Sequence, residues 1–559
     1  MNIQWSQKIL RELYNQGVRD VICCAGARNS PLVTVLSKTK GMQVHSFFEE
    51  RSGAFYALGL ARRTGRPVAI TTTSGTAAAE LLPAVIEAFH TGVPLIMLTA
   101  DRPRRLRGSG APQAIDQVGL FAKFVSREFD LEADEMFSLK DWEERSPVHI
   151  NICFDEPLID EPVENFYLAN EGVEAELMNE DVETSYAGKS GFSVSSGAEW
   201  ASLRLVKFFR IQEPLLIIVG TLETFEERVA VTGFLLDVEA PIYLEATSGL
   251  RESPELQDLS VISGDKILSW GLKYKAFTRV LRIGGVPTVR IWRDLDEPTS
   301  AVEVLSLATL PFSGLSRGEL VCTEIAPALE SLRGQSGIAL KDDYALQREV
   351  LLSKDREVAA ELENLFRDEP QAEPSLMNAL SRLIPASATV YLGNSLPIRE
   401  WDFAASRERP FSPQANRGVN GIDGQISTFI GLADRVYENW AILGDLTTMY
   451  DLSGPWAFAM NRPGLTLRLV IINNGGGKIF SRIFGTSLFE NRHDFEFEHW
   501  AKMWRMNYRK WEWIPAEFEG APAEVIEITP SAEATARFWE RYDQLWIEPE
   551  IPPAIEWSP

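Results

Sequence analysis

The repeated order of short apolar strand, Gly- or Ser-rich turn and helix constrains the fold of this 559-residue chain most. Because such strands are joined through helices, the order favours a parallel sheet covered by helices on both faces. A helix is predicted over 77–90, stopped by Gly92. Strands are predicted at 21–24, 68–70, 95–98, 215–219, 242–244, 280–283, 320–322, 389–392, 440–443 and 467–472. The sequence therefore predicts an α/β protein with doubly wound, mostly parallel sheets.

Two polar stretches divide the strands into three groups. Residues 170–198 are acidic and rich in Ser and Gly, which is typical of a linker. Residues 338–374 are polar and helix-favouring and run into Pro370 and Pro374, which indicates a connector. We therefore expect three α/β domains, at residues 1–170, 195–340 and 370–559.

Composition excludes several classes of protein. No apolar run reaches the ~18 residues that a membrane helix needs, and the N-terminus lacks a signal-peptide stretch. The four cysteines form no CxxC pair, and the five histidines are scattered and are taken as structural. The net charge of −24 disfavours nucleic acid and anionic lipid. We expect a cytoplasmic protein with small-molecule partners, which would need clustered arginines to bind an anion.

The strongest chemical signal is a pair of motifs at the ends of two predicted strands. Gly444-Asp445 follows the first strand, and Asn474 stands thirty positions after Gly444, before a run of glycines. The Asp445 carboxylate, the Asn474 amide oxygen and the Gly476 carbonyl form an oxygen-only ligand set that suits Mg²⁺ or Mn²⁺. Each motif alone is an ordinary turn, but open α/β sheets bind ligands where parallel strands end. The spacing therefore favours a metal site.

This pair of motifs resembles the diphosphate-and-metal motif of thiamine diphosphate enzymes. The N-terminal block resembles their pyrimidine-binding domain, as found in the acetolactate synthase and pyruvate decarboxylase superfamily. Its matching segments are FEERSG at 48–53, ALGLAR at 57–62, TSGT at 73–76 and TADRP at 99–103. The resemblance implies pyrimidine, central and diphosphate domains, with thiamine diphosphate and Mg²⁺ as cofactors.

Further segments resemble one branch, the SEPHCHC synthases of menaquinone biosynthesis (SEPHCHC is 2-succinyl-5-enolpyruvyl-6-hydroxy-3-cyclohexene-1-carboxylate). They are APQAI at 111–115, HIN at 149–151, LGNSLPIR at 392–399, NRG at 416–418, GIDG at 421–424 and GDL at 444–446. This resemblance implies a transferase that decarboxylates 2-oxoglutarate and adds the succinyl semialdehyde carbanion to isochorismate. It also implies a homodimer, or a dimer of dimers, with active sites at subunit interfaces.

The resemblance assigns roles to residues of the cofactor site. Glu50, rather than Glu49, matches the carboxylate that hydrogen-bonds to the pyrimidine N1′ and promotes ionisation of the thiazolium C2–H. Ile422 matches the bulky side chain that bends the cofactor. The other matching cofactor-binding positions are Ser395, Leu396, Gly444, Asp445, Leu446, Thr447, Asn474 and Ile479.

The implied substrates carry carboxylates, which the planar fork of arginine binds in a bidentate manner. The matching substrate-binding positions are Arg28, Arg102, Gln113, Arg290, Ser395, Arg399 and Arg417. Two positions depart from the family pattern: Ala27 replaces a serine and Pro112 replaces an asparagine. Both belong to the expected acceptor pocket, so another thiamine diphosphate-dependent decarboxylase or carboligase stays open. A non-catalytic regulatory paralogue is the other alternative, although Glu50, Asp445 and Asn474 are all present.

Overall fold

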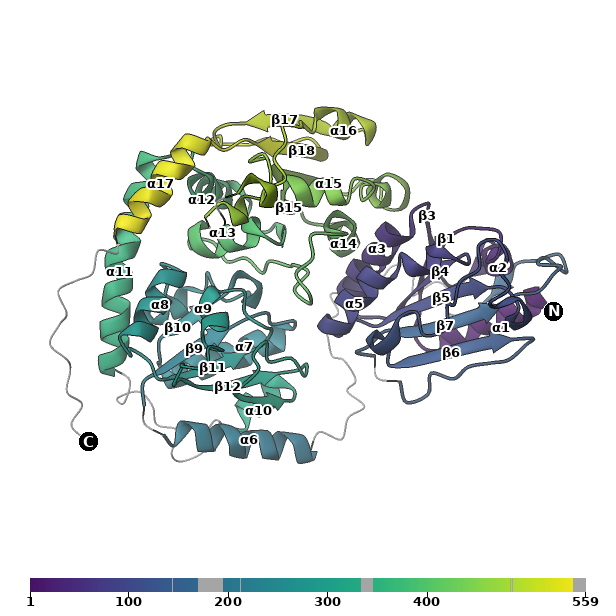
Figure 1. The fold of residues 1–559 in the computed structure, drawn as a ribbon, viewed down its shortest axis with the longest axis horizontal. Helices are drawn as coiled ribbons and strands as arrows, with labels where there is room; N and C mark the ends of the chain where they lie inside the picture. Colours follow the sequence, from purple (N-terminus) through teal and green to yellow (C-terminus); the bar gives the residue numbers. More distant parts are fainter. Residues whose placement is uncertain are drawn as a thin grey trace.

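The computed structural model describes residues 1–142, 144–168, 195–211, 213–332, 345–482, 484 and 486–545. These ranges form three large parallel sheets arranged around a common junction (Figure 1), and a two-stranded sheet of β2 (Thr39–Lys40) and β8 (Phe166–Tyr167). The predicted linker at 170–198 lies almost entirely outside the described residues. Within those ranges, no helix has both the length and the apolar character needed to cross a membrane. The α/β fold class with mostly parallel sheets is confirmed.

The first sheet has six strands in the order β3-β1-β4-β5-β7-β6, and every neighbouring pair is parallel. The predicted helix at 77–90 is wrong: two helices form, because Pro83 in the first turn of the second cannot donate a backbone hydrogen bond. The strands are β1 (Asp20–Cys24), β3 (Gln43–Phe47), β4 (Val68–Thr72), β5 (Leu95–Asp101), β6 (Arg127–Glu132) and β7 (Val148–Cys153). The helices are α1 (Asn2–Asn15), α2 (Ser30–Leu36), α3 (Glu50–Thr64), α4 (Thr76–Ala79) and α5 (Leu82–Thr91).

The second sheet has five parallel strands in the order β10-β9-β11-β12-β13. The sequence predicted all of them except β12. The strands are β9 (Leu215–Val219), β10 (Ile242–Leu244), β11 (Arg279–Ile283), β12 (Glu303–Ala308) and β13 (Glu319–Cys322). The helices are α6 (Ser195–Phe209), α7 (Phe225–Val238), α8 (Asp265–Lys273), α9 (Arg290–Asp294) and α10 (Ile325–Glu330).

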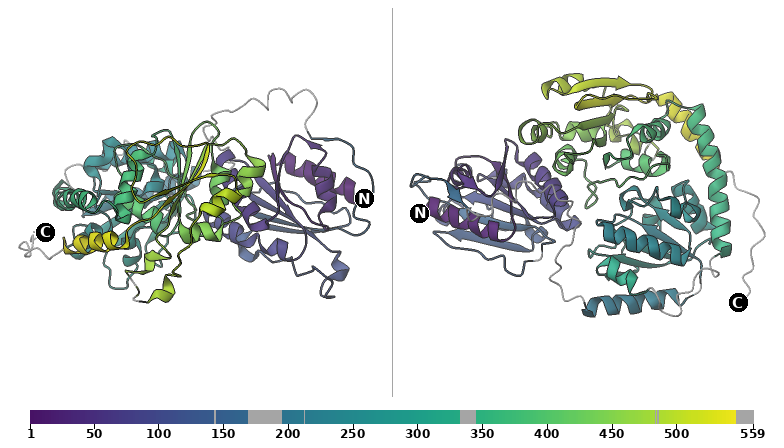
Figure 2. Two further views of the ribbon diagram at one scale, coloured as in Figure 1. Left: turned by 90° about the horizontal axis from the view of Figure 1, so that it is seen from above. Right: turned by 180° about the vertical axis from the view of Figure 1, so that it is seen from behind.

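The third sheet has the order β14-β15-β16-β18-β17, again with all neighbours parallel. Its strands are β14 (Thr389–Leu392), β15 (Asn439–Gly444), β16 (Leu467–Ile472), β17 (Asn507–Trp511) and β18 (Ala523–Ile528). Its helices are α12 (Glu373–Leu383), α13 (Leu396–Ala404), α14 (Gln425–Leu432), α15 (Asp445–Tyr450), α16 (Glu498–Met503) and α17 (Ala532–Gln544). The connector forms α11 (Ala345–Asp368), which runs beside α17 along the outer edge (Figures 1 and 2).

The first and third sheets are joined by the crossing of α3 and α14. A Cβ atom on Gly59 would lie 2.1 Å from the Thr428 carbonyl oxygen, and one on Gly431 would lie 2.5 Å from that of Tyr56. Only glycine permits this approach of one backbone to the other. Buried apolar side chains around the crossing form one core that includes strands of both sheets. The two sheets are therefore packed as one body.

We expect Gly59→Ala to destabilise the protein by about 1–3 kcal/mol, because the added methyl group would push the two helix backbones apart. Thermal unfolding followed by circular dichroism measures the effect. Gly53→Ala is the matched control on the same helix, since its added Cβ would meet only side chains, the nearest at 3.2 Å. Equal losses of melting temperature in the two variants would contradict the role given to the crossing.

Candidate active site

Asp445 and Asn474 lie side by side at the carboxyl edge of the third sheet. Asp445 begins α15 directly after β15, and Asn474 follows the neighbouring parallel strand β16. The Asp445 Oδ2 atom accepts backbone N–H groups from Gly475 at 3.0 Å and Gly476 at 2.9 Å. The His493 Nε2 atom lies 3.3 Å from the same oxygen, a contact that the sequence does not predict. The structure thus brings together all three residues predicted to bind a metal.

The donor atoms of this edge suit a hard cation. The Asn474 Nδ2 atom donates to both oxygens of the Glu373 carboxylate, at 2.9 and 3.0 Å. Its Oδ1 atom is buried and has no hydrogen-bond partner among the residues that the structure describes. Burial raises the pKa of Asp445, and a bound cation would favour its charged form. The site therefore offers an unpaired amide oxygen next to a carboxylate, which fits Mg²⁺.

The predicted cofactor-binding turns converge on the same edge. Ser395 has a left-handed backbone (φ 74°) directly before α13, which Leu396 begins. The buried Asn394 amide donates to the carbonyl oxygens of Asn416 at 2.7 Å and Gly421 at 2.8 Å. These bonds tie the turn after β14 to the segment that carries the half-buried Ile422. Leu446 and Thr447 lie in α15, and Ile479 lies in a 3-10 turn at Lys478–Phe480.

Glu49 and Glu50 have different surroundings at the start of α3. The Glu49 carboxylate caps the helix, accepting the backbone N–H groups of Arg51 and Ser52, each at 3.0 Å. It also accepts a hydrogen bond from the Ser453 hydroxyl at 3.0 Å, so its oxygens are occupied by hydrogen bonds within the protein. Glu50 is half-buried, and burial raises the pKa of its carboxyl, with Glu49 and Glu80 adding to the rise. Glu50 is therefore the better candidate for a carboxyl that exchanges a proton with a ligand.

Glu50 points away from α14 of its own chain. The residues of α3 that contact α14 are Phe55, Tyr56, Gly59 and Arg63, which share one helix face. At 100° per residue, Glu50 lies about 160° around the helix axis from the centre of that face. Among the described residues, no hydrogen bond or ion pair joins Glu50 to Asp445, and the charges that help to raise the pKa of Glu50 belong to Glu49 and Glu80.

Arg28, Arg102 and Gln113 gather at the carboxyl edge of the first sheet. Arg28 donates to the Phe154 carbonyl oxygen at 3.0 Å, and Arg102 donates to the Ser74 hydroxyl at 3.2 Å. The same hydroxyl donates to the Gln113 carbonyl at 2.8 Å. Burial and the neighbouring Arg102 lower the pKa of Arg28. This edge thus holds two partly buried guanidinium groups, and Glu156 lies 3.8 Å from that of Arg28.

The other predicted arginines lie between the second and third sheets. Half-buried Arg417 donates to the Asn394 Oδ1 atom at 2.7 Å and to the Thr288 hydroxyl at 2.5 Å. Burial lowers the pKa of Arg417, and nearby Glu245 and Asp402 oppose this. Arg399 lies close to Arg417 and donates to the Ser395 carbonyl at 2.6 Å. Arg290 begins α9 and is exposed, with its guanidinium 3.5 Å from Asp294.

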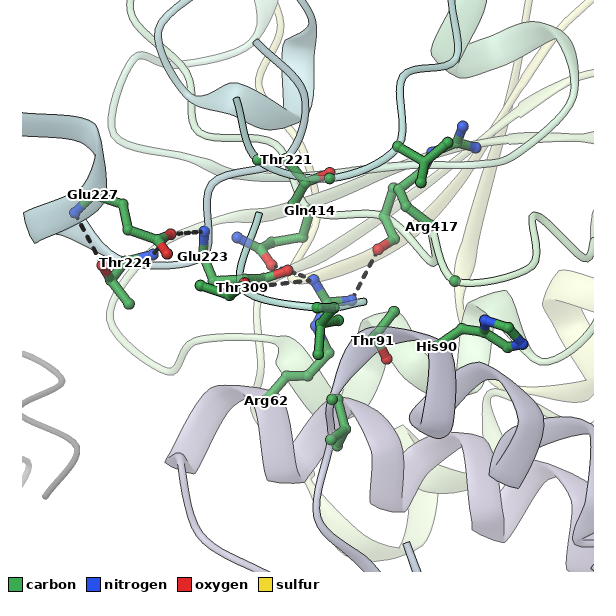
Figure 3. A pocket seen from close by; sticks show the side chains of 18 of the residues that line it. Arg62, His90, Thr91, Thr221, Glu223, Thr224, Glu227, Thr309, Gln414 and Arg417 are labelled. Carbon is green, nitrogen blue, oxygen red and sulfur yellow. Dashed lines mark hydrogen bonds and ion pairs between the residues drawn. The ribbon is translucent and has the colours of Figure 1, made fainter. Parts of the chain in front are cut away.

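A cavity of about 1080 Å³ lies where the three sheets meet (Figure 3). Arg62 crosses it from the first sheet and donates to the Ala415 carbonyl oxygen and to the Gln414 side chain, both at 2.9 Å. Of the predicted site residues, Arg417 lines the cavity, whereas Glu50, Asp445 and Asn474 are not among its described lining residues. None of the predicted cofactor-binding residues is among the described residues that line the cavity.

Sequence reasoning missed Glu373 and His493, which contact the predicted metal ligands. Glu373 stands 101 positions before Asn474, and His493 lies in a loop beyond a glycine run. Neither has a local signal, because each contact depends on how separate segments fold together. Glu373 follows Ala372 at a helix start, where a carboxylate is ordinary.

Comparisons with known proteins agree with this fold and site. Residues 3–120 match the family model "Thiamine pyrophosphate enzyme, N-terminal TPP binding domain". A solved structure from Mycobacterium smegmatis, described as a thiamin diphosphate-dependent enzyme, superposes with a TM-score of 0.66 at 16% identity. It covers 95% of this chain, and this chain covers 99% of it. Fold, site and family model together define a thiamine diphosphate-dependent enzyme.

Closer relatives identify the branch. The chain is 41% identical to the 2-succinyl-5-enolpyruvyl-6-hydroxy-3-cyclohexene-1-carboxylate synthase of Bdellovibrio bacteriovorus, over 98% of this chain and all of the relative. It is 36% identical to that of Akkermansia muciniphila, over 88% of each chain. It is 32% identical to that of Chloroflexus aurantiacus, over 90% of this chain and 88% of the relative. The chain belongs to the family of SEPHCHC synthases.

The two glutamates give a direct test of the site. Glu49→Ala should lower the free energy of unfolding by about 0.5–2 kcal/mol, because it removes a helix cap. Glu50→Gln keeps the shape but cannot exchange a proton, so it should slow hydrogen–deuterium exchange at C2 of bound thiamine diphosphate by about 10²–10⁴-fold. Quenched-flow NMR measures the exchange, and urea unfolding measures stability. Slower exchange in Glu49→Ala than in Glu50→Gln would reverse the assignment.

Proposed function

We propose that this protein catalyses thiamine diphosphate-dependent decarboxylation of 2-oxoglutarate and addition of the resulting succinyl semialdehyde carbanion to isochorismate. The products are SEPHCHC and CO₂, in menaquinone biosynthesis. The observation that carries the proposal is the full-length similarity to synthases of that name, together with the paired Asp445 and Asn474. We further propose that the enzyme works in the cytoplasm on small molecules, since its net charge of −24 disfavours nucleic acid and anionic membranes.

The residues of the third sheet would hold the cofactor by its diphosphate end. Asp445, the free Asn474 Oδ1 atom and the Gly476 carbonyl would bind Mg²⁺, which neutralises diphosphate charge. Ile422 would support the bent cofactor between its two rings. When bound, thiamine diphosphate supplies a nucleophilic carbon and then accepts the electron pair released by decarboxylation. Glu50 would hold a proton at the pyrimidine N1′, and its raised pKa supports this role.

The arginines would bind the carboxylates of the two substrates. After CO₂ leaves, one carboxylate of 2-oxoglutarate remains, and isochorismate brings two more. Arg28, Arg102 and Gln113 would contribute from the first sheet, and Ser395, Arg399 and Arg417 from the third, with Arg290 from the second. A bound carboxylate would offset the cost of burying Arg417 and of placing Arg399 beside it.

We propose that two copies of the chain complete each active site. Glu50 faces away from its own α14, so the Asp445 that it serves would belong to a neighbouring copy. The assembly would be a homodimer or a dimer of dimers, and the three domains would span 1–170, 195–340 and 370–559. In this arrangement the first domain of one copy meets the third domain of the other across the cofactor.

The direct test is incubation with thiamine diphosphate, Mg²⁺, 2-oxoglutarate and isochorismate, followed by mass spectrometry. We expect the mass of SEPHCHC together with released CO₂. The acceptor needs this test because Ala27 and Pro112 depart from the family pattern, and both are exposed at the edge of the first sheet. Release of CO₂ without the adduct would reassign the acceptor, and no decarboxylation would reject the proposal.

The donor should be selected by its distal carboxylate. Pyruvate lacks that group and would leave a partly buried arginine unpaired, so its kcat/KM should be at least about 10²-fold lower than that of 2-oxoglutarate. Steady-state kinetics of CO₂ release with each donor measures the ratio. Equal values would point to a decarboxylase or carboligase of another specificity.

The proposed metal ligand Asp445 should be essential for cofactor binding. Asp445→Ala removes the carboxylate ligand, so Mg²⁺-dependent affinity for thiamine diphosphate should fall below detection in calorimetry. The fold should remain, because strand-end loops contribute little to the core. Glu517→Ala, an exposed carboxylate near the same sheet, is the control and should bind normally. Unchanged affinity in Asp445→Ala would place the metal elsewhere.

A further inference from the structure

The Asn474 amide can present either of two atoms to a ligand. Its oxygen accepts and its nitrogen donates, while the two ends have nearly the same shape. Only the oxygen can bind a hard cation, so rotation of the amide by half a turn would abolish the site. A metal site at Asn474 therefore requires a neighbouring group that favours the orientation with the oxygen toward the metal.

The Glu373 carboxylate fixes the orientation of the Asn474 amide. Both of its oxygens accept hydrogen bonds from Asn474 Nδ2, at 2.9 and 3.0 Å. An ionised carboxylate only accepts, so the rotated amide would set oxygen against oxygen. With Nδ2 held on this side, Oδ1 is left buried and unpaired among the described residues.

Glu373 is itself held by three separate elements. It is the buried first residue of α12, and its backbone N–H donates to the Thr535 hydroxyl of α17 at 3.0 Å. Glu400 of α13 is buried and hydrogen-bonds to it. A carboxylate fixed in this way cannot turn to follow a rotating amide, so the orientation of Asn474 is set before any metal binds.

We propose that Glu373 is a positioning residue of the metal site, which locks Asn474 in the one amide orientation that presents oxygen to the cation. The proposal rests on the proposed function of Asp445 and Asn474 as metal ligands. It goes further because it assigns a role to a residue from another part of the sequence that does not touch the cation. A buried glutamate that only stabilised the fold would have no effect on which end of the amide faces the metal.

The test is a swap of hydrogen-bond polarity, with Mn²⁺ and thiamine diphosphate as probes. In Glu373→Gln, the introduced amide can donate to Asn474 Oδ1 and draw it from the metal, so Mn²⁺ affinity should fall about 10–100-fold. In Asn474→Asp, two carboxylates face each other, and affinity should fall similarly. In the double variant, the introduced glutamine donates to the introduced aspartate, whose second oxygen faces the metal. Affinity should then recover to within about tenfold of the parent.

Electron paramagnetic resonance of free Mn²⁺ measures these affinities without any turnover. Glu373→Asp keeps an acceptor-only group, so it should bind Mn²⁺ more tightly than Glu373→Gln. Glu408→Gln changes an exposed carboxylate of the same domain and should leave affinity unchanged. Thermal unfolding without metal identifies any variant that fails to fold. If the double variant fails to fold, the Mn²⁺ affinities of Glu373→Asp and Glu373→Gln still test the positioning role.

The outcomes separate the inference from the proposed function. If the double variant binds no better than either single variant, or Glu373→Asp binds no better than Glu373→Gln, the positioning role is wrong. This conclusion requires that Asp445→Ala has lost Mn²⁺ binding, because that loss supports Asp445 as part of the metal site. If Asp445→Ala binds Mn²⁺ like the parent, the proposed metal site is wrong.

Discussion

The backbone contact between α3 and α14 is the constraint on which the arrangement of the site depends. Gly59 and Gly431 let the two helices approach until a Cβ atom would meet a carbonyl oxygen at 2.1–2.5 Å. This approach fixes the rotation of α3, and with it the direction of Glu50 at the start of the helix. The same crossing that joins the first and third sheets therefore turns Glu50 away from α14 of its own chain. In the arrangement that we propose, each chain would contribute half of each of two active sites.

The predicted substrate-binding arginines are concentrated at the edges of the sheets, although the chain as a whole is acidic. The chain carries 79 acidic and 55 basic residues, yet its predicted substrate-binding arginines cluster at sheet edges, and three of the five are half-buried. Burial lowers the pKa of Arg28 and Arg417, which is a cost that a bound carboxylate relieves. In the proposed function, this cost would favour dicarboxylate donors, because a ligand without the second carboxylate would leave a partly desolvated cation unpaired.

Residues at strand ends were predictable from the sequence, and residues joined by tertiary packing were not. Asp445 and Asn474 follow neighbouring parallel strands, which must end at the same edge of a sheet. Glu373 reaches Asn474 across 101 positions, so no local pattern shows it. Strands β17 and β18 were missed: β17 is a largely exposed edge strand with charged residues, and β18 buries two glutamates that break its apolar pattern. The prediction of a single helix at 77–90 was wrong because Pro83 begins a second helix, and this proline could have been read from the sequence.

The central claim is that each active site takes Glu50 from one chain and Asp445 from another, and mixed dimers test it most directly. Glu50→Gln and Asp445→Ala should each be inactive alone, since every site carries a lesion. In a mixed dimer one site collects both lesions and the other collects none. Random two-fold mixing makes about half the dimers mixed, so about a quarter of all sites should be intact. Co-expression should therefore restore roughly a quarter of wild-type activity. No recovery after verified subunit exchange would show that each chain builds its own site.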